Sequence, residues 1–314
     1  MSGEISRVNY TLPKKKISIK KICKENNWPY ERIILSTGIK YKYVSNKNET
    51  ALKLAFSACK KLKFKRTDID ALIYVTQSPE YLLPTTACIL QNMLNLRKNI
   101  LAYDINQGCS GFVYGLFTSF SFLKQQQIKN VLLVCSDTYT KYIKKGNKSC
   151  ETIFSDGASA MILKKNSSKK SSFLFGTDGS GFNDLIVKNS ASNYNKNLMP
   201  EIFMDGKKVL MFTMSNIPKF IFELLNKNRL KINQIKYFIF HQASKVVIDN
   251  LIRKINLPAN KVFCNYEKIG NTVSSTIPIA LHDLNIRKKI KRGDRLLLCG
   301  FGVGYSMAAS IIEY

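Results

Sequence analysis

The stretch Tyr237-Phe238-Ile239-Phe240-His241-Gln242-Ala243 passes from an apolar run into polar residues and then into a helical pattern over residues 246–255. An earlier stretch, Leu72-Ile73-Tyr74-Val75-Thr76-Gln77-Ser78, follows the same course and leads into a helical pattern over residues 85–94. Matching Gln77 to Gln242 gives an offset of 242 − 77 = 165 residues. A strand-to-helix unit that recurs at a fixed distance indicates an internal repeat.

Two more pairs of segments recur at nearly the same distance. Matching Cys109 to Asn271 gives 271 − 109 = 162, and matching Cys135 to Cys299 gives 299 − 135 = 164. The paired strand-like segments are 102–105 with 261–266, and 131–135 with 295–299. The chain is therefore predicted to be a duplication of two halves, residues 1–168 and 169–314, joined through the Lys/Ser-rich stretch 164–172.

Each half alternates apolar runs with helical segments, which is typical of parallel strands covered on both faces. Each half also closes with a pair of strand-like runs, 131–136 with 158–163 and 295–299 with 306–313. The helical segments 112–123 and 273–284 carry apolar residues on nearly every face, so we expect both to be buried between two sheets. The predicted fold is a duplicated α/β, five-layer α/β/α/β/α sandwich.

Composition limits the class of protein. The 314 residues are 45% hydrophobic, which is enough for a large core and argues against disorder. The sequence has no apolar run of about 18 residues, and residues 1–16 lack the apolar core of a signal peptide, so we expect a cytoplasmic protein without a membrane span. Eight cysteines occur without a C-x-x-C pair, so neither a metal site nor a disulfide framework is predicted.

The formal net charge of +28 comes from 49 Lys and Arg against 21 Asp and Glu. Such an excess is compatible with nucleic acid, an anionic membrane face, an acidic protein partner, or simply a lysine-rich composition on solvated surfaces. The basic runs 14–16, 60–66 and 287–292 are scattered and do not alternate with aromatic residues, as a groove for single-stranded nucleic acid requires. A non-catalytic nucleic-acid-binding protein is therefore the least favoured hypothesis.

Three residues on three strand-to-helix loops have the chemistry of a catalytic site. Cys109 begins the buried helix of the first half, where the helix dipole and free N–H groups are expected to lower the pKa of its thiol. His241 follows an apolar strand at its carboxyl end, where α/β proteins place their sites. Asn271 occupies the position of Cys109 in the second half, so the duplication brings the two together. Taken singly, a packed cysteine, a satisfied core histidine and an N-cap asparagine are ordinary structural residues.

Together, a thiol and two neutral hydrogen-bond donors suit thioester chemistry. A cysteine accepts an acyl group readily and releases it readily. A malonyl thioester that loses CO2 supplies a carbanion without a strong base, and His241 and Asn271 would polarise the carbonyl on which negative charge develops. The glycine-rich run 300–304 follows a strand, so we expect the backbone N–H of Val303, with that of Cys109 itself, to face the acyl oxygen.

These residues resemble the thiolase superfamily and, within it, the beta-ketoacyl-acyl-carrier-protein synthase III family. The resemblance runs from about residue 33 to the C-terminus. It is most specific at Gln107-Gly108-Cys109-Ser110-Gly111, His241-Gln242-Ala243-Ser244, Gly270-Asn271-Thr272 and Gly300-Phe301-Gly302-Val303-Gly304. It implies a thiolase-like acyltransferase in which Cys109 carries the acyl group while His241 and Asn271 assist decarboxylation and condensation. It also implies a homodimer, an acyl-CoA donor, a malonyl thioester of an acidic acyl carrier protein, and no metal or other cofactor.

The sequence departs from the family pattern near the expected CoA site. Arg32 stands where a tryptophan is expected, and Ser36 replaces a basic residue. Ser244 replaces an asparagine, Val246 stands at the position of a carrier-docking arginine, and Val303 replaces a glycine. The primer need not be acetyl-CoA, and the pathway is either fatty-acid synthesis or a specialised acyl-chain synthesis. Lys245, Arg253 and Lys254, on the helix after His241, are the candidates for docking an acidic carrier.

Other chemistries remain open at this point. An acyl-cysteine also permits transfer to an oxygen or nitrogen nucleophile without a new carbon–carbon bond. A hydroxymethylglutaryl-CoA-synthase-like reaction would need a carboxylate such as Glu80, and a biosynthetic thiolase would need a second cysteine such as Cys299. The depth of an acyl pocket would depend on residues such as Leu82, Leu83 and Phe203, which the sequence cannot place.

Overall fold

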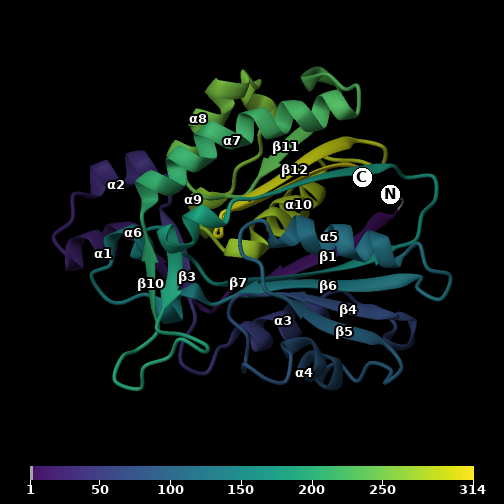
Figure 1. Ribbon diagram of the computed structural model, residues 1–314, viewed down its shortest axis with the longest axis horizontal. Coiled ribbons are helices and arrows are strands. Elements are labelled where there is room, and N and C mark those ends of the chain that lie inside the picture. The colour runs from purple at the N-terminus through teal and green to yellow at the C-terminus, as the bar shows by residue number, and fades with distance from the viewer. Residues whose placement is uncertain (1–2) are drawn as a thin grey trace.

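The structure, a computed structural model, describes residues 3–314, and these residues form the layers expected from the sequence (Figure 1). One sheet has the strand order β1-β7-β6-β4-β5 and the other has the order β8-β13-β12-β11. The strands of the first sheet are β1 (Glu4–Thr11), β4 (Ala71–Val75), β5 (Leu101–Ile105), β6 (Asn130–Asp137) and β7 (Gly157–Lys164). Those of the second sheet are β8 (Ser171–Thr177), β11 (Tyr237–Phe240), β12 (Arg295–Gly302) and β13 (Ser306–Glu313).

The two sheets repeat one pattern of pairing. In the first, β4 is parallel to β6, β6 is antiparallel to β7, and β7 is antiparallel to β1. In the second, β11, β12, β13 and β8 pair in the same sequence of directions. This confirms the duplicated α/β fold and the two predicted closing pairs of strands. The proposed boundary between residues 168 and 169 lies in the connection from β7 to β8, and the division into halves stays a prediction.

Two helices lie between the sheets, α5 (Gly111–Phe122) and α10 (Thr276–Ile286) (Figure 1). Side chains from both helices, including Phe112, Phe120 and Leu281, belong to one buried apolar cluster with residues of both sheets. Because both helices are apolar on nearly every face, burial between two sheets removes more apolar surface from water than a one-sided position would. The central layer of the predicted sandwich is therefore confirmed.

The outer layers are amphipathic helices, each packed on one sheet (Figure 1). Helices α3 (Ala51–Lys60) and α4 (Thr86–Met93) pack on the first sheet, and α7 (Gly206–Lys227) and α8 (Lys245–Ile255) pack on the second. The Thr50 side chain accepts from Lys53 N at the start of α3, and Asp205 accepts from Lys207 N and Lys208 N at the start of α7. An N-cap of this kind contributes about 1 kcal/mol.

The remaining elements are short and surround the edges of the two sheets. They are β2 (Lys15–Ser18), β3 (Tyr41–Val44), β9 (Leu185–Lys188), β10 (Glu201–Met204), α1 (Ile19–Glu25), α2 (Tyr30–Thr37), α6 (Lys148–Glu151), α9 (Tyr266–Ile269) and the 3₁₀ helices η1 (Arg66–Asp68), η2 (Tyr139–Tyr142), η3 (Gly179–Asp184), η4 (Ile232–Gln234), η5 (Ala259–Lys261) and η6 (Val273–Ser275). Among residues 3–314, none of the helices combines the length and apolarity needed to cross a membrane.

The second half lacks a full counterpart of β5. Segment 261–266 was expected to be a strand, but it contributes only the single bridge between Phe238 and Val262. The side chain of Gln242 occupies the place of a strand neighbour, because its amide donates to Phe263 O at 3.3 Å and accepts from Asn265 N at 3.0 Å. The expectation of a strand there was wrong, since a side-chain amide satisfies backbone groups that a ladder would otherwise pair.

Candidate active site

Cys109, His241 and Asn271 line one cavity of about 140 Å³ between the two halves. Cys109 lies just before α5, His241 directly after β11, and Asn271 just after α9. All three residues are buried, with His241 only 1% exposed. Apart from Thr213 and Ser244, the rest of the cavity is apolar, and it is bounded by residues of α7 and α8. The duplication thus brings together the three side chains that the sequence singled out.

The glycine run at the end of β12 lets the two halves meet at the thiol. A Cβ atom on Gly300 would lie 2.5 Å from the carbonyl oxygen of Cys109 and 2.7 Å from the Cα of Ser110. A Cβ atom on Gly302 would lie 3.1 Å from Cys109 Sγ, and this glycine has a φ of 153°. Side chains at either position would push β12 away from Cys109, so the close approach requires glycine.

The electrostatics of Cys109 differ from the expectation of a lowered pKa. Burial, and to a smaller extent the nearby Asp137 carboxylate, raise the pKa of the Cys109 thiol to about 12. Hydrogen bonds from the backbone N–H groups of Val303 and Cys109 lower the pKa but do not outweigh burial. The resting residue is therefore a neutral thiol, and the two N–H groups predicted to face an acyl oxygen lie beside its sulfur.

A raised thiol pKa predicts a distinct pH dependence of alkylation. The thiolate fraction should grow about tenfold per pH unit from about pH 7 to about pH 10, without a plateau. The rate at which iodoacetamide modifies Cys109, followed by peptide mass spectrometry, should rise in the same way. The exposed Cys88 provides an internal comparison on the same chain. A rate for Cys109 that is already level at neutral pH would show a lowered pKa instead.

His241 is held in a fixed orientation as a neutral ring. Its Nδ1 lies 2.8 Å from Thr276 Oγ1, its Nε2 lies 3.3 Å from Asn271 Nδ2, and the ring meets Phe301 edge-to-face at 5.9 Å between centroids. Burial lowers the pKa of His241 to about 3, with a backbone hydrogen bond to Val273 opposing the shift. Thr276 Oγ1 also lies 3.0 Å from Val273 O and has a single proton to donate. Nε2 carries the proton and faces the cavity as a neutral donor when the Thr276 hydroxyl donates to Nδ1 instead of to Val273 O.

Asn271 is fixed through its backbone and its side-chain oxygen. Its backbone N–H donates to Ile153 O at 3.1 Å, and its carbonyl accepts from Ser155 N at 2.8 Å. Its Oδ1 accepts from Val273 N at 2.9 Å, which leaves the Nδ2 group beside His241. Asn271 therefore supports the turn before α10, as a capping asparagine would, while presenting one amide donor to the cavity.

Asp137 ties the two halves together beneath the thiol, and sequence reasoning missed it. Its Oδ1 accepts from Gln77 N at 2.8 Å, and its Oδ2 accepts from both the hydroxyl and the N–H of Ser274. Burial raises the pKa of Asp137 to about 7, although its hydrogen bonds from Ser274 and Gln77 lower it. Asp137 ends β6, and the rule that drew attention to His241, a polar residue at a strand's carboxyl end, applies to it equally.

The residues of the alternative chemistries lie elsewhere. Neither Glu80 nor Cys299 lines the cavity of Cys109, and Cys299 is fully buried in β12, where its carbonyl accepts from His241 N. Leu82 and Leu83 are 77% and 83% exposed on the loop before α4, and Phe203 is 42% exposed on β10. The expectation that these three set the depth of this cavity was wrong for the single chain, because their side chains face outward.

The candidates for docking a carrier lie on α8, and four of the residues that depart from the family pattern lie on α2 or in the cavity itself. Lys245 pairs with Asp249, Arg253 donates to Asn250 Oδ1 and Lys254 donates to Met214 O, so all three have partners within the chain. Arg253 and Lys254 are nonetheless exposed, whereas Lys245 is half-buried. Arg32 and Ser36 are exposed on α2, while Ser244 and Val246 line the cavity itself.

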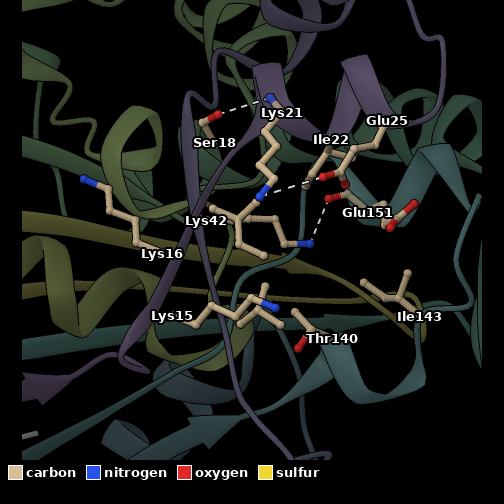
Figure 2. A pocket seen from close by; sticks show the side chains of 12 residues that line it. Lys15, Lys16, Ser18, Lys21, Ile22, Glu25, Lys42, Thr140, Ile143 and Glu151 are labelled. Carbon is tan, nitrogen blue, oxygen red and sulfur yellow. Dashed lines mark hydrogen bonds and ion pairs between the residues drawn. The ribbon is translucent and has the colours of Figure 1, made fainter.

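A separate cavity of about 340 Å³ lies between β2, β3, α1 and α6 and is rich in lysine (Figure 2). Lys42 is buried there, and its ammonium group donates to Glu151 O at 2.8 Å. Burial lowers the pKa of Lys42 to about 8. Glu151 lies two residues before Ile153, whose carbonyl binds Asn271, so Lys42 anchors the segment that supports Asn271.

Comparisons with known proteins agree with this geometry. Residues 103–179 match the family model of 3-oxoacyl-[acyl-carrier-protein (ACP)] synthase III, and residues 225–314 match the model of its C-terminal part. The beta-ketoacyl-[acyl-carrier-protein] synthase III of Coxiella burnetii is 31% identical over 99% of both chains, and that of Clostridium tetani is 31% identical over 92% of this chain and 90% of the relative. A crystal structure of a 3-oxoacyl-(acyl-carrier-protein) synthase III is 33% identical and superimposes over both full chains with a TM-score of 0.96.

Fold and comparisons together define an acyltransferase of the thiolase-like class. Within that class, the chain belongs to the beta-ketoacyl-[acyl-carrier-protein] synthase III family.

Proposed function

We propose that this enzyme joins an acyl group from acyl-CoA to a malonyl-[acyl carrier protein] by decarboxylative Claisen condensation, with Cys109 as the acyl carrier. The observation that supports these roles is the shared cavity, in which a buried thiol, an imidazole and a carboxamide meet. Membership of the family supports the reaction, and the two thioesters are its substrates, without a metal or other cofactor. The product serves fatty-acid synthesis or a specialised acyl-chain synthesis.

The first half-reaction uses Cys109 alone as the covalent group. Its sulfur attacks the carbonyl carbon of the acyl thioester, the carbon–sulfur bond to CoA breaks, and CoA leaves with the proton that the thiol gave up. The N–H groups of Cys109 and Val303 are proposed to stabilise the negative charge on the attacked oxygen. Since the pKa of the thiol is raised, these donors offset part of the cost of forming charge in a buried site.

The second half-reaction uses the pair of neutral donors. The malonyl thioester loses CO2, and its carbonyl oxygen gains negative charge between His241 Nε2 and Asn271 Nδ2, which lie 3.3 Å apart. The resulting carbanion attacks the acyl carbonyl carbon, and the bond from that carbon to Cys109 Sγ breaks. A neutral imidazole suits this step because it donates a hydrogen bond without protonating the carbanion.

Acyl transfer to oxygen or nitrogen is the weaker candidate. It would need a path by which an alcohol or amine reaches the acylated thiol. It would also leave His241 and Asn271 without a second carbonyl group to which they could donate. Binding of nucleic acid likewise gains no support from the site, and the positive charge is instead proposed to attract the acidic carrier. The cytoplasm stays the predicted compartment.

The homodimer predicted from the resemblance has a suitable surface. Strand β5 lies at the edge of the first sheet, with β4 as its hydrogen-bonded neighbour, and its first residue, Leu101, is 38% exposed. The exposed apolar residues Tyr81, Leu82 and Leu83 precede α4, whose first N–H groups bind Asp104 of β5. An open strand edge beside an apolar loop is a surface that a second copy would cover.

Charge reversal on α8 tests the proposed carrier-docking face. We expect Arg253→Glu or Lys254→Glu to raise KM for the malonyl-carrier at least about tenfold at low salt, because each replaces attraction by repulsion. The rate of acylation by acyl-CoA should stay unchanged. Lys289→Glu, an exposed substitution just beyond α10, is the matched control. Equal effects of Lys289→Glu and the α8 variants would show that only net charge matters and would remove the docking assignment.

A further inference from the structure

A hydrogen-bonded pair of side chains stands beside Cys109 and lines a second cavity next to that of the thiol. Tyr139, on η2, donates its hydroxyl to Gln77 Oε1 at 2.5 Å, and Tyr139 is only 3% exposed. The two residues belong to different loops of the first half, after β6 and after β4. The hydrogen bond therefore joins two loops of the first half through their side chains rather than through backbone.

The pair lies directly against the nucleophile's own segment. A Cβ atom on Gly108 would lie 2.4 Å from Gln77 Oε1 and 2.7 Å from Val303 Cγ1, so the amide of Gln77 covers the backbone just before Cys109. Tyr139 shares an apolar cluster with Cys109, and its ring centroid is 5.2 Å from that of Phe154, which lines the cavity. These contacts place the pair within reach of a group attached to the sulfur.

Asp137 holds one member of the pair, Gln77, in place and precedes the other in the chain. It binds the backbone N–H of Gln77 at 2.8 Å and lies two residues before Tyr139. Its other oxygen is tied to Ser274 of the second half. Because Asp137, Ser274 and Tyr139 are buried, moving the pair would cost unsatisfied hydrogen bonds as well as packing.

Beside the pair lies a second cavity of about 360 Å³, whose lining is mostly apolar but includes Asn106 and Ser190. Gln77 and Tyr139 line it together with aliphatic residues that include Ile186, Val187 and Ile202. Leu185 lines both this cavity and that of Cys109, so the two spaces are neighbours. A hydrocarbon chain that extended from Sγ past the pair would enter a mostly apolar environment.

We propose that the Gln77–Tyr139 pair limits the acyl group on Cys109 to a short chain, and that cutting back Tyr139 opens the second cavity to longer chains. The inference rests on the proposed function. In the proposed reaction the CoA part of the incoming thioester enters through the cavity bounded by α7 and α8, so the acyl chain points away from that cavity, toward the pair. A long chain would have to break a part-buried hydrogen bond and displace an aromatic ring, whereas an acetyl group would not.

The rate of acylation of Cys109 by acetyl-, butyryl-, hexanoyl- and octanoyl-CoA, measured by intact-protein mass spectrometry, tests the proposal. In the unmodified enzyme the octanoyl rate should be at least about 100-fold below the acetyl rate. Tyr139→Ala should narrow that ratio at least about tenfold. Tyr139→Phe keeps the aromatic ring and should keep a large part of the difference between the acetyl and octanoyl rates. Tyr142→Ala, a tyrosine substitution on the same 3₁₀ helix but outside the pair, should leave the ratio unchanged.

The outcomes separate the inference from the proposed function. If no acyl-CoA gives an adduct on Cys109 in the unmodified enzyme, the proposed function fails. If adducts form but octanoyl-CoA reacts as fast as acetyl-CoA, or if Tyr139→Ala slows every chain equally, the pair does not set chain length. Circular dichroism checks folding, and if Tyr139→Ala does not fold, Gln77→Ala tests the same pair from its other side.

Discussion

Replacing Cys109 with serine is expected to abolish acyl-enzyme formation. The substitution keeps the size of the side chain and its position before α5, so the fold should survive. A serine hydroxyl, however, is a far weaker nucleophile than a thiol, and no group in the cavity acts as a strong base toward it, since His241 is held neutral with its pKa lowered to about 3. Intact-protein mass spectrometry with acetyl-CoA should show an adduct on the unmodified chain and none on Cys109→Ser.

The exposed Cys88 supplies the control for this experiment. Cys88→Ser should acylate at the same rate as the unmodified chain, because Cys88 lies outside the cavity. Peptide mapping should place the adduct on Cys109. An adduct that persists in Cys109→Ser, or that maps to another cysteine, would remove Cys109 from its proposed role.

Removing either neutral donor is expected to separate the two half-reactions. His241→Ala and Asn271→Ala should still form the acyl-Cys109 adduct, because neither side chain takes part in thioester exchange. Decarboxylation of the malonyl thioester and release of the condensed product should fall about 10²–10³-fold in each, since each variant removes one hydrogen bond from the developing oxyanion. Single-turnover measurement of adduct formation and of CO2 release gives both quantities on the same sample.

Two outcomes would contradict this division of labour. If His241→Ala lost acylation as fully as condensation, the imidazole would be acting on the thiol. If Asn271→Ala condensed at the normal rate, its carboxamide would serve only the turn that it holds through Val273 N. A thermal melt of each variant shows whether the turn itself has collapsed.

Much of the architecture could be predicted because the duplication repeats the apolar strand segments of the first half in the second half. The runs around Tyr74 and Phe238 are short, apolar and followed by helical patterns, and they became β4 and β11. Segment 261–266 failed the same prediction because the Gln242 side chain, not a neighbouring strand, satisfies its backbone. Sequence spacing identified the repeat, but it did not show that a side chain takes the place of a neighbouring strand in the second half.

The candidate site was predictable in its residues but not in its electrostatics. Loop position brought Cys109, His241 and Asn271 together, whereas the direction of the pKa shift of Cys109 depends on burial and on Asp137, which only coordinates reveal. The contact between Gln77 and Tyr139 joins two loops about 60 residues apart in the sequence, so no local sequence pattern predicts it. Leu83 drew attention as an apolar residue, yet its side chain faces outward.

One measurement tests the central claim most directly: the fate of a labelled acyl group when the acylated enzyme meets malonyl-[acyl carrier protein]. The label should leave Cys109 and appear in a 3-oxoacyl-carrier product lengthened by the two carbons of the decarboxylated malonyl unit, with one CO2 released per label transferred. Loss of the label to an alcohol or amine, without CO2 release and without a new carbon–carbon bond, would contradict the assignment of this cavity to condensation.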